Sequence, residues 1–474
     1  MMSKHAFAYF LSHGVPALVS FASIAIFTRM LTPEEYGMYA LVFAIAGMIN
    51  AVIFEWLKLS LLRYYSRYQE DNRFFETIKL SFLGLLVASL VVGVLTMFFF
   101  QGKAFSPVFI LLTLLFSWTQ SWNSINLTLM RAKLSPKSYG ILAFSRTTLG
   151  LVLGTAFIYA GYAEIGLLIG LMLGFWITLM RPTLKYWKIG LDYKAFQTDY
   201  LKQFLKYGMP LTITLLLSVI IHNSDRLIID YLLDTSATGI YSVTYDLSEQ
   251  TIFTLMMIIN LAAFPIAVKV MEEKGELAAY EQVKKNTSLI FLIAIPAVTG
   301  FILISQNITN VFLGESFREE ALSLIPYIAI GALLKGFKLY SVDIMFHLKQ
   351  RTSLQIYPVV GAAILNVVLN FLLIPKYGIE GAAMGTVIAY AFAVAISWII
   401  VHIQISPLPF PLKDFISVLT ASCIMALALW PFHQQTGLFF LAVQLLVGGT
   451  AFVGAVIVLN TMNARNLILK KFSR

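Results

Sequence analysis

The lysines and arginines of this chain are sorted between alternating loops, and this pattern limits the folds that are open to it. The chain contains about fourteen apolar stretches that are each long enough to cross a bilayer. The loops between them alternate between rich and poor in lysine and arginine, and the only lysines and arginines in the poor set are Arg29, Lys103, Arg318 and Lys376. Because basic loops stay on the cytoplasmic side, the pattern predicts a multi-pass protein of the inner (cytoplasmic) membrane with both termini in the cytoplasm.

The apolar stretches predict an all-α fold without a soluble domain. They cover residues 6–28, 38–62, 79–100, 105–129, 139–160, 163–180, 207–231, 238–267, 287–305, 322–347, 354–374, 380–402, 414–431 and 437–460. We expect two six-helix bundles, over residues 1–206 and 207–410, followed by two helices and a basic cytoplasmic tail over 411–474. No loop is long enough for a folded domain, and no GxxxxGK[ST] phosphate-binding loop occurs. Any transport or chemistry is therefore expected within the helices.

Composition excludes several classes of protein. The chain is 59% hydrophobic and only 12% charged, which lies far outside the range of soluble proteins. The net charge of +10 lies in the basic loops, so it indicates orientation and contact with anionic lipid head groups, not nucleic-acid binding. The one cysteine, Cys423, lies in an apolar stretch, and the six histidines have no zinc-binding spacing. We expect no metal site, no cofactor and no catalytic residue.

The two halves of the chain repeat two short patterns. Residues 31–39 (LTPEEYGMY) and 233–241 (LDTSATGIY) share Leu, Gly and Tyr at the same spacing. Residues 162–166 (YAEIG) and 377–381 (YGIEG) each join an apolar stretch to the next through a short turn that restarts on glycine. Both pairs occur in the same order and on the same side, which favours duplication. Six-helix halves of like orientation predict a two-fold axis along the membrane normal and a central cavity between the halves.

Several charged residues lie inside apolar stretches, where a lone charge costs at least about 2.5–3.5 kcal/mol. The predicted topology places them in three groups by depth: Glu55, Lys58 and Arg146 in the inner half; Lys335 and Lys338 near the middle; and Asp225, Arg226, Asp230, Asp246 and Glu249 in the outer half. Glu55 and Lys58 are three residues apart, so they share one helix face and can neutralise each other. Among the remaining charges, Arg146, Lys335 and Lys338 outnumber Asp343, which leaves a cationic surplus there and an acidic surplus in the outer group.

These surpluses predict a binding function. A cationic cavity suits an anionic head group, and the outer acidic group suits a coupling proton or sodium ion. The alternative is structural, because the same residues could form ion pairs that clamp helices together, or lysines could extend to the interface. Pro16 follows Gly14 in the first stretch, where a proline kink suits a gate. Aromatic residues beside basic ones, such as Tyr65 and Trp187, are typical of a membrane-interface belt.

Three segments resemble the polysaccharide-transporter branch of the multidrug/oligosaccharidyl-lipid/polysaccharide exporter superfamily. They are residues 28–39 (TRMLTPEEYGMY), the run from Asp225 to Tyr241 followed by Phe264-Pro265, and residues 366–383 (NVVLNFLLIPKYGIEGAA). The resemblance implies a flippase that moves undecaprenyl-pyrophosphate-linked sugar repeat units of the O-antigen, capsule or exopolysaccharide type to the outer leaflet. It further implies that the cationic residues of the cavity hold the head group. Arg29, at the outer end of the first helix, is then expected to act in gating or to form an ion pair.

The implied partners are the lipid-linked oligosaccharide, membrane lipids, and a polysaccharide polymerase with its chain-length regulator. Three other functions stay open. A cation-coupled drug or metabolite antiporter of the same superfamily fits the acidic outer group. A peptidoglycan lipid II flippase fits the helix count, although it is expected to have a more arginine-rich cavity. A membrane glycosyltransferase or polymerase would need a large outer loop or an acidic metal motif in a soluble part, and no loop here supplies either.

Overall fold

The computed structural model describes residues 18–99, 106–187 and 190–465, and every regular element within them is helical. The chain divides into two compact units, residues 1–239 and 240–474. α8 belongs to the first unit, because it packs against α2 and α3. It therefore falls after the bundle boundary at 206/207 that was expected from the sequence, and the division into helix bundles stays a prediction.

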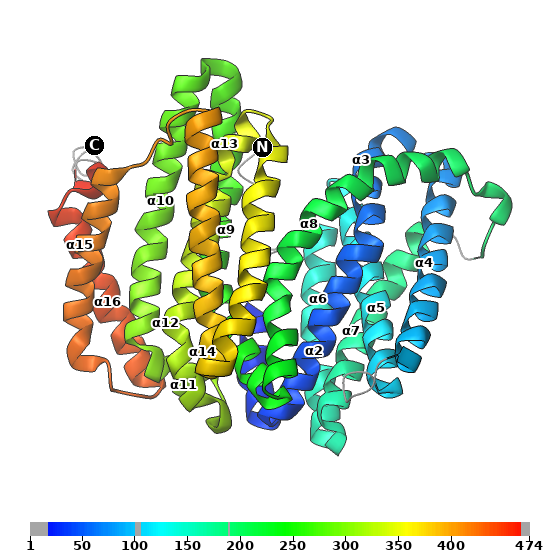
Figure 1. Ribbon diagram of the computed structural model, residues 1–474, viewed down its shortest axis with the longest axis horizontal. Coiled ribbons are helices and arrows are strands. Elements are labelled where there is room, and N and C mark those ends of the chain that lie inside the picture. The colour runs from blue at the N-terminus through cyan, green and yellow to red at the C-terminus, as the bar shows by residue number, and fades with distance from the viewer. Residues whose placement is uncertain (1–17, 100–105, 188–189, 466–474) are drawn as a thin grey trace. The chain divides into compact units, whose positions relative to one another are not determined.

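The first unit is built from helices and three short turns of helix. It comprises a helix over Leu18–Met30, α2 (Pro33–Ile49), η1 (Asn50–Phe54), α3 (Glu55–Tyr68), α4 (Asn72–Phe99), α5 (Pro107–Ala132), α6 (Pro136–Phe157), η3 (Ile158–Tyr162), α7 (Ala163–Tyr186), η4 (Tyr193–Ala195) and α8 (Thr198–Leu232). Figure 1 shows most of these helices side by side, with α8 running obliquely across them. Within the unit, α6 packs along α7, and α5 packs against α2, α3 and α7.

The second unit begins within α9 (Thr235–Lys274). It comprises α10 (Glu276–Leu303), α11 (Ser305–Phe312), α12 (Glu315–Phe337), η5 (Lys338–Val342), α13 (Ile344–Leu348), η6 (Thr352–Gln355), α14 (Ile356–Gln404), α15 (Leu412–Leu429), η7 (Trp430–Phe432), α16 (Leu438–Val458) and η8 (Thr461–Asn463). In this unit α12 packs against α10 and α14, and α15 lies beside α10 and α16 (Figure 1).

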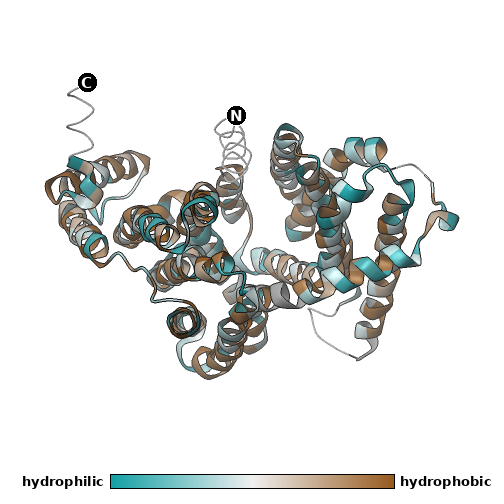
Figure 2. Ribbon diagram, turned by 90° about the horizontal axis from the view of Figure 1, so that it is seen from above, coloured by the Kyte–Doolittle hydropathy of each residue, from teal (hydrophilic) through white to brown (hydrophobic). Residues whose placement is uncertain are grey.

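Length and hydropathy confirm a polytopic membrane protein. Among the described residues, nine segments are long and apolar enough to cross a membrane. The two helical parts of α14, which a kink separates, have 49 residues in all. At about 1.5 Å per residue they together exceed twice the thickness of a bilayer's hydrocarbon core. Figure 2 shows hydrophobic residues over most of the helices and hydrophilic ones gathered on connecting segments.

The second sequence repeat forms a tight turn in each unit. Gly378 has φ 59° and ψ −143° and divides α14 into two helices. Gly161, with φ 91°, divides α6 from α7 at the matching place. A positive φ is readily adopted only by glycine, so these two positions bend the long apolar segments back on themselves. The turns expected at 162–166 and 377–381 therefore lie within one or two residues of the observed ones.

The first sequence repeat forms two capped helix starts. Thr32 Oγ1 accepts a hydrogen bond from the Glu35 amide, and the Glu35 carboxylate accepts one from the Thr32 amide at 2.8 Å. At the start of α9, Asp234 Oδ1 accepts a hydrogen bond from the Ala237 amide at 2.7 Å. Caps of this kind satisfy amides that have no partner in the first helical turn. The shared spacing therefore reflects a shared local structure.

The glycines of these two segments contact each other's helix starts. A Cβ added to Gly37 would lie 1.9 Å from the Thr235 carbonyl oxygen, and one added to Gly239 would lie 2.0 Å from the Pro33 carbonyl oxygen. Each glycine thus packs against the first residue of the opposite helix. The contact is reciprocal, as expected for two related segments.

We expect Gly37→Ala and Gly239→Ala each to destabilise the protein by about 1–3 kcal/mol, because backbone atoms must move to admit the methyl group. The measurement is the midpoint of thermal unfolding of the purified protein. Gly449→Ala is the control, since a Cβ there has no neighbour within 4 Å. Equal midpoints for all three variants would contradict this account of the contact.

An aromatic cluster packs α3, α4, α5 and α8 of the first unit together. Tyr65 and Trp187 are only 7% and 3% exposed, and Trp187 Nε1 donates to Asn126 Oδ1 at 3.0 Å. Both side chains are packed inside this cluster and do not face outward, and their place at a membrane interface stays a prediction. The Tyr200 hydroxyl donates to Asp71 Oδ2 at 2.5 Å, and this hydrogen bond raises the pKa of Tyr200 to about 12. The bond ties the start of α8 to the segment between α3 and α4.

Candidate functional site

Glu55 and Lys58 form the ion pair that their spacing predicts. Lys58 Nζ lies 2.6 Å from Glu55 Oε1. The Lys58 side chain is 30% exposed and the Glu55 side chain is 17% exposed. They occupy the first turn of α3, directly after the π-helical turn η1. Because π-helical turns inside helices often occur at functional sites, this position fits a functional role. The pair itself carries no net charge.

Lys338 and Asp343 form an ion pair within one short segment. Lys338 Nζ lies 2.6 Å from Asp343 Oδ2, and the side chains are 4% and 3% exposed. The two residues are five apart, a spacing that an ordinary α-helix would place on different faces. The π-helical turn η5 changes this, since the Asp343 amide donates to the Lys338 carbonyl. This pair is therefore local and buried.

Lys335 forms an ion pair with Glu249, which joins α12 to α9. Lys335 Nζ also lies 4.4 Å from the centre of the Phe253 ring, which adds a cation–π contact. The sequence grouped Glu249 with the outer acidic residues and assigned Lys335 to a cationic surplus. Those groupings are wrong for this pair, because each residue has the other as a partner. Lys338 likewise has a carboxylate partner, so neither lysine adds net charge.

Arg146 is an embedded cation that forms no ion pair with any residue that the structure describes. It lies on α6, half-buried, with its guanidinium carbon 5.3 Å from the centre of the Phe175 ring on α7. Among the residues that the structure describes, no carboxylate lies within ion-pair distance of it. A cation at this depth is costly without a counter-ion. Arg146 is therefore suited to an anionic ligand.

Asn123 is a further polar residue that the sequence analysis missed. It lies on α5 and is fully buried, and neither its amide nitrogen nor its amide oxygen has a hydrogen-bond partner among the described residues. Asn123 lies eleven residues before Leu134, which is in the α5–α6 turn, and Arg146 lies twelve residues after Leu134. The two residues thus lie at nearly the same level on packed neighbouring helices. The polar run 117–126 (SWTQSWNSIN) in an apolar stretch was the available signal.

The outer acidic group is divided between the two units. In the first unit, Asp225 and Arg226 are buried, at 1% and 2% exposure. Asp230 accepts a hydrogen bond from Thr235 Oγ1 at 2.7 Å. Asp246 and Glu249 belong to the second unit. Their joint role as an ion site or clamp stays a prediction.

The two residues assigned to gating differ in what the structure describes. Arg29 is exposed at the end of the first helix, and its Nη1 donates to the Ala25 carbonyl at 2.5 Å. Pro16 lies outside the described residues. Within the described ranges, no group of three His, Cys, Asp or Glu side chains could hold a metal ion.

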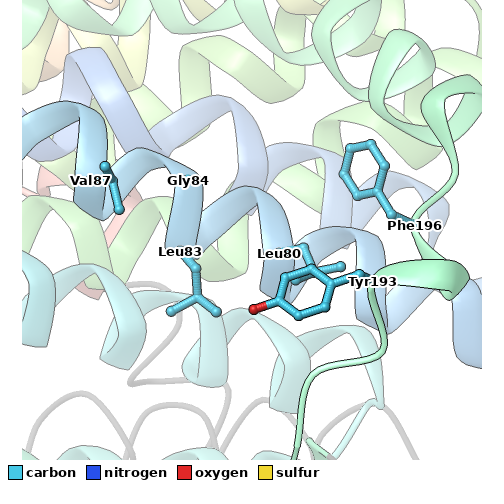
Figure 3. A pocket seen from close by; sticks show the side chains of 6 residues that line it. All are labelled: Leu80, Leu83, Gly84, Val87, Tyr193 and Phe196. Carbon is cyan, nitrogen blue, oxygen red and sulfur yellow. The ribbon is translucent and has the colours of Figure 1, made fainter.

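One recess in the first unit is apolar and contains none of the predicted site residues. It has a volume of about 450 Å³ and is lined by Leu80, Leu83, Gly84, Val87, Tyr193 and Phe196. Figure 3 shows the α4 side chains on one side and the two aromatic rings of the η4 segment on the other. A surface of this composition suits hydrocarbon rather than a charged head group.

The fold is similar to that of solved membrane transporters. It aligns with the lipid II flippase MurJ in an inward closed conformation with a TM-score of 0.77 and 15% identity, over 97% of this chain and 99% of MurJ. It aligns with an inward-facing multidrug resistance transporter of the MATE family with a TM-score of 0.63 and 15% identity, over 84% of this chain and 98% of that one. The chain thus shares its fold with MurJ and with MATE-family transporters.

The sequence narrows this class to one family. Residues 26–322 match the family described as polysaccharide biosynthesis protein, and the chain belongs to that family. A Shigella flexneri protein assigned as an O-antigen transporter is 21% identical over 406 residues, which cover 78% of this chain and 91% of that protein. The resemblance seen in the sequence motifs is confirmed by the family match and by the fold.

Proposed function

We propose that this protein is a flippase for undecaprenyl-pyrophosphate-linked oligosaccharide repeat units, and that O-antigen-type units are its cargo. Family membership and the similarity to an O-antigen transporter support this substrate class. The fold supports alternating access, since it is shared with transporters in inward closed and inward-facing conformations. The observation that carries the proposal is Arg146, an embedded cation with no carboxylate near it among the described residues. A diphosphate is the anion that it would bind.

The membrane arrangement belongs to the same proposal. We infer about fourteen crossings, because helices occupy each of the apolar stretches that the structure describes and the kinks at Gly161 and Gly378 divide two long segments. Two pseudo-symmetric bundles, 1–206 and 207–410, would enclose a central cavity. Helices α15 and α16, within 411–474, would add the last two crossings. Both termini would lie in the cytoplasm, beside the basic loops.

The proposed roles follow from the charges. Arg146 would bind the diphosphate, with Asn123 donating or accepting a hydrogen bond beside it. The Glu55–Lys58 pair and the two lysines of the second unit, Lys335 and Lys338, would line the path of the head group. The acidic group on α8 and α9 would bind H⁺ or Na⁺, or clamp the two helices. Arg29 and Pro16 would act in gating.

The test is surface-glycan display in a strain that lacks this protein. We expect deletion to abolish display and the wild-type protein to restore it, with membrane levels checked by immunoblot. Retained glycan together with altered drug tolerance would instead indicate a multidrug antiporter. Retained glycan together with a defect in peptidoglycan assembly would indicate a lipid II flippase. Either of these last two results would overturn the proposal.

A further inference from the structure

The apolar recess of the first unit lies between α4 and the α7–α8 connector, and this connector is fixed to α4 on both sides of η4. After η4, the Gln197 amide donates a hydrogen bond to Thr77 Oγ1 at 3.1 Å. Before η4, Lys79 Nζ donates to the Gly190 carbonyl at 2.6 Å. Between these two points, Asp192 Oδ1 accepts hydrogen bonds from two amides of η4, at 3.1 and 3.3 Å. The recess is therefore built into the fold.

Gly84 provides the open space of this recess. A Cβ added to Gly84 would have no neighbour within 4 Å among the described residues. Glycine lowers the stability of a helix interior, and here it leaves room between Leu80 and Val87, which also line the recess. The volume of about 450 Å³ lies within the range of ligand sites. From Leu80 to Val87 the helix rises about 10 Å, roughly one third of a bilayer's hydrocarbon core.

The apolar surface of α4 continues beyond the recess. Val87, Val91 and Leu95 are all exposed, and they are four residues apart. This spacing places them in one stripe along the helix, and α4 is among the segments apolar enough to cross a membrane. A hydrocarbon chain that enters the recess can therefore continue along α4.

The carboxylates near the first turns of α4 are engaged within the protein. Glu76 forms an ion pair with Lys79 at 2.8 Å. Asp71 accepts a hydrogen bond from the Tyr200 hydroxyl, and Asp192 accepts the two from η4. These acidic side chains are therefore already hydrogen-bonded or paired at this end of the recess.

Two basic side chains at the same end are exposed. Arg73 and Lys194 form no ion pair among the described residues. Arg73 precedes Gly84 by eleven residues, a spacing that places both on one face of α4. Lys194 follows Tyr193, whose ring lines the recess (Figure 3). Residues 181–206 as a whole hold six lysines and arginines and only two acidic residues. This end of the recess therefore suits an anionic group.

We propose that the recess is a binding site for an anionic phospholipid. One acyl chain lies over Gly84, and the phosphate lies beside Arg73 and Lys194. Basic pockets beside membrane helices bind anionic lipid head groups in this way, while the apolar walls accept only the chain. The bound lipid adds a contact between the α7–α8 connector and α4. The site uses none of the residues proposed to bind cargo, and it goes beyond the proposed function.

The test is native mass spectrometry of the full-length protein. The protein is purified in detergent, stripped of lipid and titrated with phosphatidylglycerol. Phosphatidylethanolamine with the same acyl chains measures the binding of a lipid without net negative charge. We expect one phosphatidylglycerol to bind at least fivefold more tightly than phosphatidylethanolamine. Equal affinities for the two lipids would overturn the proposal.

Two variants separate the recess from the charges. Gly84→Leu fills the recess and should weaken phosphatidylglycerol binding at least tenfold. Its matched control is Gly454→Leu on α16, where an added Cβ also has no neighbour within 4 Å, and this variant should bind as the wild type does. Arg73→Gln/Lys194→Gln keeps the apolar walls and should lower the affinity for phosphatidylglycerol to that for phosphatidylethanolamine. Wild-type binding by Gly84→Leu would show that the lipid sits elsewhere.

A competing lipid identifies the source of the chain. Undecaprenyl phosphate, which has one polyprenyl chain and an anionic head, is added at the same concentration as phosphatidylglycerol. We expect phosphatidylglycerol to stay bound, and its displacement would assign the recess to a polyprenyl tail and overturn the phospholipid proposal. The double variant changes only exposed side chains, so it tests the site if Gly84→Leu fails to fold. These measurements involve no transport, so a negative result leaves the flippase proposal to the test of glycan display.

Discussion

Replacement of Arg146 by alanine is expected to abolish surface-glycan display without lowering the amount of folded protein. Arg146 lies at membrane depth against the Phe175 ring, with no carboxylate near it among the described residues. Its removal takes away a costly charge, so the unfolding midpoint should stay the same or rise. Its removal also takes away the guanidinium that would bind the diphosphate through two parallel hydrogen bonds. We expect display to fall at least a hundredfold.

A conservative variant and a control variant test whether the charge or the shape of the Arg146 side chain matters. Arg146→Lys keeps the charge but loses the planar two-pronged geometry, so it should retain a small fraction of the display. Arg181→Ala is the control, because Arg181 is an exposed arginine at the far end of α7. Display is measured by glycan immunoblot, and folded protein by fluorescence-detected size exclusion after heating. A fall in folded protein that matches the loss of glycan would show that Arg146 is structural.

Loss of Lys338 is expected to produce the largest effect on stability. Lys338 and Asp343 are almost completely buried as a pair. Lys338→Met would leave the Asp343 carboxylate buried without its cation. Removing one partner of a buried ion pair typically costs about 3–5 kcal/mol. We expect the unfolding midpoint to drop by many degrees and the membrane level to fall.

The double variant separates charge from packing. Lys338→Met/Asp343→Leu removes both charges and should recover most of the lost stability, because replacing a buried pair by apolar residues is often neutral or favourable. Lys269→Met should have little effect, since its pair with Glu273 is exposed and such pairs contribute about 0–1 kcal/mol. If the double variant is as unstable as the single one, the buried carboxylate is not the cause.

The helices and their local contacts were largely predictable. Apolar stretches of membrane length carry their signal within a window of about twenty residues, and the described structure places helices at those stretches. The Glu55–Lys58 pair was predicted because residues three apart share a helix face. The Lys338–Asp343 pair was not, because it depends on the π-helical turn η5, which the spacing of apolar residues does not reveal.

The long-range contacts of the site could not be read in this way. Lys335 and Glu249 are 86 residues apart, and several acidic residues offered equally reasonable partners. Asn123 carries no charge, so nothing marked it as different from other polar residues in α5. Tyr65 and Trp187 lie beside basic residues, as interface residues do, yet they are packed in an aromatic cluster.

The sequence by itself determined that this chain is a multi-pass helical membrane protein of the polysaccharide-transporter type. Hydropathy and local spacing are properties of single segments, so they need no knowledge of which helices are neighbours. Only the tertiary structure decided which embedded charges neutralise each other and that no ion pair involves Arg146 among the described residues. The reason is electrostatic, because the interaction of two charges depends on their distance and burial, and both follow from helix packing.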